Sequence, residues 1–263
     1  MKFSKPTEAA IEVAKKAGRL LKSGFTTNYK ISNKQGIQNL VTEYDFKSEK
    51  LIIKELKKRY PKSSFLAEEE GQVGVDSKEI KWIIDPLDGT VNFAHRIPFF
   101  CVSIGAEQNG EIILGVIYNP IADELFVAEK NKGAYLGKKK IQVSNTKEME
   151  KAFLATGFPY NLKDNPENCI DRSLAFLKMG LPLRRLGSAA LDMAYVACGR
   201  YDGFWETSLG PWDCAAGKIM VEEANGKITN WEGGPFKLSS YNTLVASNGK
   251  LHNEMLKILK KHA

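Results

Sequence analysis

Apolar residues recur every three or four positions along two segments near the amino end, a spacing typical of amphipathic helices. The first segment covers residues 7–24 and ends at Gly24; its apolar positions are Ala10, Val13, Ala14, Ala17, Leu20 and Leu21. The second segment covers residues 45–60 and stops before Pro61; its apolar positions include Leu51, Ile52 and Leu56. The pattern therefore predicts two helices in the first quarter of the chain.

Short apolar runs separated by turn residues come next, and they predict strands. Residues 81–84 form one run that ends at Asp85, and residues 99–108 and 111–118 flank Asn109-Gly110, a pair typical of a β-hairpin. The remaining elements are predicted as strands at 124–128, 152–156 and 182–186, and as helices at 188–198, 212–224 and 250–261. This mixture indicates an α+β fold and argues against an all-helical bundle.

Length and composition fit a folded globular chain, because 43% of the 263 residues are hydrophobic. We interpret residues 1–263 as a single domain, with an N-terminal part at about 1–145 and a C-terminal part at about 146–263. Apolar runs are too short to cross a bilayer, and the first residues lack the apolar core of a signal peptide. We therefore expect a cytoplasmic protein with no membrane partner.

Charge, cysteine and histidine content narrow the function only slightly. The net charge is +7, but the lysines are scattered, so a solvated surface explains them while attraction to phosphate ligands or nucleic acid stays open. Cys101, Cys169, Cys198 and Cys214 lack zinc-ligand spacing, and we expect reduced, mostly buried thiols. We expect surface positions for the histidines, which are His95, His252 and His262.

The most informative stretch is WIIDPLDGTVNF at residues 82–93. An apolar strand runs into Asp85, a proline-led turn follows, and Asp88 lies where it can face the same point. Gly89 lets the backbone approach a ligand closely, and the amides of Gly89 and Thr90 can point at an anion. Two carboxylates beside a phosphate cradle suit a magnesium-dependent phosphoryl site, because magnesium prefers oxygen ligands and completes its shell with water and phosphate.

Two further acidic patches could complete such a site. Glu68 follows the apolar run 65–67, and Asp213 stands at the start of a predicted helix of small residues. Each also has an ordinary interpretation, a solvated charge run for residues 68–70 and a helix cap for Asp213. Spacing alone leaves the choice between these interpretations and a metal site open.

Together these motifs closely resemble the signatures of the inositol monophosphatase family. The first signature matches throughout residues 82–93, and the second matches WDCAAG at 212–217 followed by 223–226, except that Asn225 replaces a usual glycine. Asparagine also tolerates a left-handed backbone, so the helix can still end there. Residues 39–45, Glu68-Glu69 and GSAALD at 187–192 fall in family order, and Arg184-Arg185 is similar to the bacterial branch of this lithium-sensitive, magnesium-dependent phosphatase superfamily.

The resemblance implies a layered αβαβα sandwich, of the type shared by inositol monophosphatase and fructose-1,6-bisphosphatase, and usually a homodimer. It implies that Glu68, Asp85 and the carbonyl of Leu87 hold one Mg²⁺, and that Asp85, Asp88 and Asp213 hold a second. A third, looser ion would use Glu68 near Lys34, which gives two to three ions per site.

The implied reaction is hydrolysis of a phosphomonoester by a metal-activated water, without a covalent intermediate. Thr90 would orient the water and Asp45 would hold the threonine hydroxyl, so that Asp45, Glu68 and Thr90 are the implied catalytic residues. The implied substrate contacts are Asp88, Gly89, Thr90, Gly187, Ser188, Ala189, Glu206 and Asp213. Glu206, which follows Phe204-Trp205 at an expected strand end, could equally be a surface residue.

Several functions share these motifs. We expect hydrolysis of myo-inositol monophosphate to inositol and phosphate, with a small phosphorylated polyol or sugar as partner. Fructose 1,6-bisphosphate or a 3′-phosphonucleotide could be hydrolysed at the same metal site. Outside the enzymes, some bacterial relatives bind transcription or translation machinery, and Arg184 with Arg185 would permit such an accessory role here.

Overall fold

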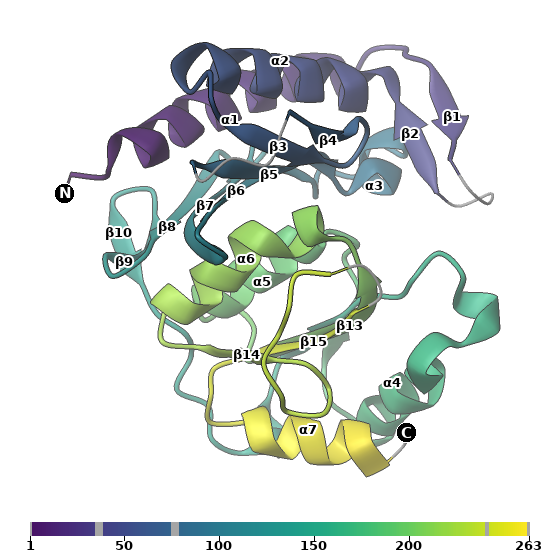
Figure 1. Cartoon of the computed structure of the whole chain (residues 1–263). Coiled ribbons are helices and arrows are strands. Elements are labelled where there is room, and N and C mark those ends of the chain that lie inside the picture. The colour runs from purple at the N-terminus through teal and green to yellow at the C-terminus, as the bar shows by residue number, and fades with distance from the viewer. Residues whose placement is uncertain (1, 35–38, 75–78, 240–241, 262–263) are drawn as a thin grey trace.

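The computed structural model describes residues 2–34, 39–74, 79–239 and 242–261, and its elements stack in five layers (Figure 1). Helices α1 (Lys5–Gly24) and α2 (Glu43–Arg59) form the first layer, above an eight-stranded sheet. Helices α5 (Ala189–Ala197) and α6 (Pro211–Glu223) separate this sheet from a five-stranded one. Helices α4 (Cys169–Lys178) and α7 (His252–Lys261) form the last layer. This order confirms the predicted αβαβα sandwich.

The large sheet has the strand order β10-β9-β8-β7-β6-β5-β3-β4, and only β3 and β5 run parallel to each other. Apolar side chains from α1 and α2 meet one face of this sheet in a continuous core, which buries most of the predicted helix positions, whereas Leu20 and Leu51 are half-buried. The strands are β3 (Ser64–Ala67), β4 (Gly71–Val73), β5 (Lys81–Asp88), β6 (Cys101–Gln108), β7 (Glu111–Asn119), β8 (Glu124–Glu129), β9 (Gly133–Leu136) and β10 (Lys139–Ile141).

The small sheet has the order β12-β11-β13-β15-β14, and α4 and α7 cover its outer face. Side chains alternate along its central strand: Phe204 faces the middle helices, while Trp205 faces outward and stacks on Phe176 of α4. The strands are β11 (Leu154–Thr156), β12 (Leu183–Arg184), β13 (Gly203–Leu209), β14 (Lys227–Thr229) and β15 (Asn242–Ser247).

Helix α6 lies directly on the large sheet because two glycines beneath it lack side chains. Gly105 of β6 pairs with Gly115 of β7. A Cβ at Gly115 would lie 2.6 Å from the carbonyl oxygen of Ala216, and one at Gly105 would lie 2.7 Å from Cβ of Ala215. This close approach fixes the height of the helix, and with it the position of its first turn, above the strands.

Most predicted elements are confirmed with small changes of boundary, and four points differ. The strand predicted at residues 182–186 is only the two-residue β12, and β5 continues through Pro86 to Asp88 instead of ending at Asp85. The surface prediction for His252 is wrong, because its ring is buried between the hydroxyls of Thr229 and Ser247. Glu206 lies inside β13 instead of at its end.

The other predictions concern the cysteines, the histidines, the domain division and membrane spans. Three of the four cysteines are buried, as expected, and His95 is exposed, whereas His262 lies outside the described residues. The large sheet ends with β10 and the small one begins with β11, so the predicted division near residue 145 falls in their connection; the single-domain interpretation stays a prediction. Within the described ranges, every helix is too short or too polar to span a lipid bilayer.

Candidate active site

A cavity of about 280 Å³ is lined by residues of the large sheet and of the amino ends of the middle helices. Nearly all site residues predicted from the sequence line it, although they come from both halves of the chain. These are Glu68, Asp85, Leu87, Asp88, Gly89, Thr90, Gly187, Ser188, Ala189, Glu206 and Asp213. Asp45 is the exception, because it is fully buried behind Thr90.

An irregularity in β5 brings its two aspartates to the same face. Residues three apart in a regular strand point to opposite faces. Here Asp85 pairs with Ser103 and Asp88 pairs with Cys101, so β5 contains one more residue than β6 between these pairs. Both carboxylates therefore face the cavity, and the Leu87 amide donates to Oδ1 of Asp85 at 2.9 Å.

Asp88 is held by the amino end of α5. Its Oδ2 accepts the hydroxyl of Ser188 at 2.6 Å and the amide of Ala190 at 2.8 Å. Ser188 is also the N-cap residue of α5. The positive end of this helix dipole thus faces a buried carboxylate, and it ties β5 to the middle layer.

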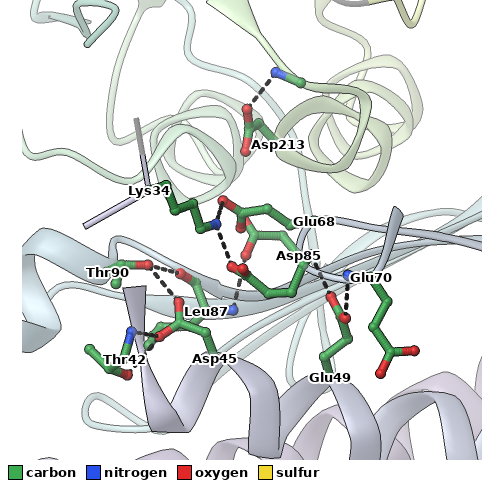
Figure 2. A network of polar contacts seen from close by, with 12 residues as sticks. Lys34, Thr42, Asp45, Glu49, Glu68, Glu70, Asp85, Leu87, Thr90 and Asp213 are labelled. Carbon is green, nitrogen blue, oxygen red and sulfur yellow. Dashed lines mark hydrogen bonds and ion pairs between the residues drawn. The ribbon is translucent and has the colours of Figure 1, made fainter. Parts of the chain in front are cut away.

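Asp213 faces the same cavity from the opposite side (Figure 2). It stands in the first turn of α6, where its Oδ2 accepts the amide of Gly210 at 2.6 Å. The capping interpretation is confirmed, and it is compatible with the site interpretation, because only one oxygen caps the helix. Among the described residues, no hydrogen bond engages its Oδ1.

Thr90 and Asp45 form a buried pair beside the acidic cluster. Gly89, with φ at 95°, turns the chain sharply from β5 into the short helix α3 (Thr90–Ala94). The Thr90 hydroxyl then lies 2.9 Å from Oδ1 of Asp45 and 3.0 Å from the carbonyl oxygen of Leu87. Oδ2 of Asp45 accepts both the amide and the hydroxyl of Thr42, at 2.8 and 2.6 Å. Asp45 is thereby fixed by the capping box that begins α2.

Glu68 reaches the cavity from the turn after β3, where a lysine accompanies it (Figure 2). The ammonium of Lys34, between β1 (Ile31–Asn33) and β2 (Leu40–Thr42), donates to Oε1 of Glu68 at 2.8 Å and also contacts Glu69. Burial opposes the charge on Lys34, but Glu68 and Glu69 outweigh it and raise the lysine pKa. Lys34 therefore supplies a positive charge where the family resemblance implies a third, looser ion.

Burial of these acids in one cavity shifts their proton affinities upward. Burial, followed by the charge of Glu68, raises the pKa of Asp85 and of Asp213 well above its ordinary value. Burial raises the pKa of Asp88 to about 6, that of Asp45 to about 7 and that of Glu206 to about 8. Such a cluster favours either bound protons or a bound cation.

Comparison with known proteins shows to which family the chain belongs. The model of the inositol monophosphatase family matches residues 3–263. The chain belongs to the inositol monophosphatase family. An inositol-1-monophosphatase of Synechocystis is 43% identical, over 96% of this chain and 88% of the relative. The Nus factor SuhB of Escherichia coli K12 is 38% identical, over 94% of this chain and 92% of the relative.

A solved structure extends the likeness to three dimensions. The extragenic suppressor protein suhB of Bartonella henselae superposes with a TM-score of 0.92 at 42% identity, covering 98% of this chain and 99% of that one. Membership of the inositol monophosphatase family confirms the fold and the enzyme class, a phosphoric monoester hydrolase, that were predicted from the sequence.

The ligand atoms available in this cavity suit a hard cation that prefers oxygen ligands. Carboxylate residues and Leu87 line it, whereas the two described histidines, His95 and His252, do not. In the described part of the chain, no three acidic, histidine or cysteine side chains are grouped tightly enough to enclose an ion. An open set of this kind fits magnesium, which keeps several waters and shares ligands with phosphate. It does not fit a closed structural zinc site.

Several cavity residues were missed by sequence reasoning. A Cβ at Gly157 would lie 2.0 Å from Oε2 of Glu206, so this glycine makes room for the glutamate. Tyr160 and Arg185 line the cavity rim. Thr42, which is buried against Asp45 and does not line the cavity, was missed as well, although a threonine three residues before an acid is typical of a capping box.

We expect magnesium to raise the unfolding temperature more at about pH 8 than at about pH 5. The pKa of Asp88 is raised in the folded chain to about 6. Its contribution to stability is therefore complete below its ordinary pKa near about 4 and is lost as pH rises through about 6. A cation replaces the protons, so acid opposes its binding.

Scanning fluorimetry at the two pH values, with and without magnesium, measures this difference. Sodium chloride at matched ionic strength is the control. Equal magnesium shifts at both pH values would contradict competition between protons and the cation.

Proposed function

We propose that this chain is a magnesium-dependent phosphatase that hydrolyses myo-inositol monophosphate to inositol and phosphate. The observation that carries the proposal is the convergence of acids from both halves of the chain on one cavity. Glu68 follows β3, Asp85 and Asp88 lie on β5, Glu206 lies on β13, and Asp213 lies on α6.

The proposed metal ligands follow from these positions. Glu68, Asp85 and the carbonyl of Leu87 would hold one Mg²⁺, and Asp85, Asp88 and Asp213 would hold a second. Among the described residues, the second carboxylate oxygens of Asp85, Asp88 and Asp213 have no hydrogen bond and can bind a cation. When bound, magnesium would supply an acidified water and offset the charge of the phosphoryl oxygens.

Thr90 is proposed to position the attacking water. Its single hydroxyl proton goes to Asp45 or to the Leu87 carbonyl, so its oxygen can accept a hydrogen bond from water. Asp45 keeps this orientation because Thr42 fixes its other oxygen. The amides of Gly89 and Thr90 are proposed to bind phosphate, since Gly89 adopts the left-handed conformation that turns the backbone toward the cavity.

The alcohol part of the substrate is proposed to lie against Glu206 and the start of α5. Glu206 shares the inward face of β13 with Phe204, which supports a pocket role over the surface alternative. Gly187, Ser188 and Ala189 line the neighbouring wall of the cavity. Hydroxyl groups of a polyol could donate to the carboxylate of Glu206, whereas the proposed ions contact the phosphate.

Two broader aspects stay predictions. A homodimer and a cytoplasmic location are expected from the sequence. The relationship to a protein named Nus factor SuhB supports a second candidate, an accessory role in transcription, for which the exposed Arg184 and Arg185 are available contacts. Binding to RNA or polymerase that survives Asp88→Asn would support that role.

The proposal predicts phosphate release from inositol 1-phosphate that requires magnesium. We expect a higher kcat/KM for inositol 1-phosphate than for fructose 1,6-bisphosphate, 3′-phosphoadenosine phosphate or glycerol phosphate. Excess chelator should abolish release, because the ligands are oxygen donors without a catalytic histidine or cysteine. A colorimetric phosphate assay measures both effects. Undiminished phosphate release in chelator would exclude the metal mechanism. A higher kcat/KM for the bisphosphate or the nucleotide would make that compound the proposed substrate instead of inositol 1-phosphate.

Thr90→Ala and Asp45→Asn should each lower kcat by on the order of 10²–10⁴. KM and the magnesium midpoint should change little, because neither residue is a proposed ligand of the two ions. The double variant should be about as slow as the slower single variant, since the two act as one unit. Steady-state kinetics measure these changes in kcat and KM, with Thr90→Ser as control. A near-normal kcat for Thr90→Ala would exclude the proposed role of Thr90 and Asp45 in positioning the water.

Glu206→Gln should raise KM for inositol 1-phosphate by on the order of tenfold and affect glycerol phosphate less. Gly157→Ala should act in the same direction, because its Cβ would lie 2.0 Å from the Glu206 carboxylate and displace it. Kinetics on both substrates provide the comparison. Equal increases in KM for the two substrates would exclude Glu206 as a contact of the inositol hydroxyls.

A further inference from the structure

One face of α2 carries three polar side chains that are almost fully buried. Asp45, Ser48 and Glu49 are each at most 1% exposed. Their spacing of three and four residues places them on the same side of the helix. Buried polar groups need partners, and each of these residues has one in a different segment of the active site.

The partners of Ser48 and Glu49 are backbone groups that no strand pairing satisfies. Ser48 Oγ donates to the carbonyl of Pro86, inside the irregular part of β5, at 2.8 Å. The turn between β3 and β4 exposes two consecutive amides toward α2. Oε2 of Glu49 accepts the amide of Glu69 at 2.9 Å, and Oε1 accepts the amide of Glu70 at 2.8 Å (Figure 2).

The turn that Glu49 holds is the one that carries Glu68. Ala67 pairs with Gly71, so residues 68–70 form the whole connection between β3 and β4. The amide of Glu68 bonds to the carbonyl of Ile84, the residue before Asp85, at 3.2 Å. Glu68 is thus fixed on one side by β5 and on the other by the two amides bound to Glu49.

We propose that Glu49 is a positioning residue that holds the 68–70 turn so that the Glu68 carboxylate meets the cation of the phosphatase site. This inference rests on the proposed function, because it requires Glu68 to be a metal ligand. A carboxylate is needed at position 49, since both of its oxygens accept. A glutamine would turn an NH₂ group toward one of the two amides, and an aspartate is shorter by one methylene.

The test compares Glu49→Gln with variants of the same helix. Glu55→Gln removes a charge that pairs with Lys16 on the outer side, and Ile52→Val removes one buried methylene and leaves every hydrogen-bonding side chain of α2 in place. The first readout is amide hydrogen exchange of residues 69 and 70 in metal-free protein. The second is the magnesium midpoint of thermal stabilisation.

Glu49→Gln should accelerate exchange at residues 69 and 70 and raise the magnesium midpoint by on the order of tenfold, the size typical of outer partners of metal ligands. Saturating magnesium should restore much of kcat. Glu55→Gln and Ile52→Val should leave the midpoint unchanged. A midpoint shift no larger than that of Ile52→Val would overturn the proposal, because Glu49 would then support only the fold.

Two further variants keep the outcome decisive. Glu68→Gln tests the underlying ligand: if it leaves the magnesium midpoint unchanged, the proposed ligand set is wrong. If Glu68→Gln shifts the midpoint and Glu49→Gln does not, only the role of Glu49 is overturned. Should Glu49→Gln fail to fold, Glu49→Asp replaces it, with an intermediate shift expected and an unchanged midpoint again counting against the proposal.

Discussion

The repulsion among carboxylates in one buried cavity is the constraint on which the rest of this structure depends. Asp85, Asp88 and Asp213 are brought together from β5 and α6, and burial with mutual charge raises their pKa values. Such a cluster persists only if the surrounding chain supplies hydrogen-bond donors and leaves room for a cation. The amino ends of α5 and α6 both point at the cavity and provide donors and favourable dipoles.

The layered architecture is how one chain meets this constraint. The large sheet supplies Asp85 and Asp88 through the extra residue in β5, and the small sheet supplies Glu206 through the inward face of β13. Helix α2 lies on the far face of the large sheet, yet its polar side chains reach the same segments. The cavity is therefore built from the first layer through to the fourth, which is why its residues are scattered along the sequence.

Sequence patterns predicted the mixture of helices and strands and located the acids, whereas the five-layer order and the roles of the acids were implied by the resemblance to the inositol monophosphatase family. The helical spacing at residues 7–24 and the run 82–93 needed no three-dimensional information. Sequence reasoning could not place Glu206, whose role depends on which face of β13 turns inward, or Gly157, which matters only through a neighbour distant in sequence. It misplaced His252, because the hydroxyls of Thr229 and of the nearby Ser247 satisfy both ring nitrogens in the core.

The close packing of α6 on Gly105 and Gly115 has a mechanical consequence. At Gly105 and Gly115 the strand backbone lies directly against α6, so no side chain from these two positions separates the helix from β6 and β7. We therefore expect Asp213 and the strands beside Asp85 to move together, with the width of the acidic cleft set by this close packing. If the site accepts alcohols of different shape, another part of the cavity rim must adapt to them. Tyr160, in the segment after β11, lies on this rim and projects into solvent.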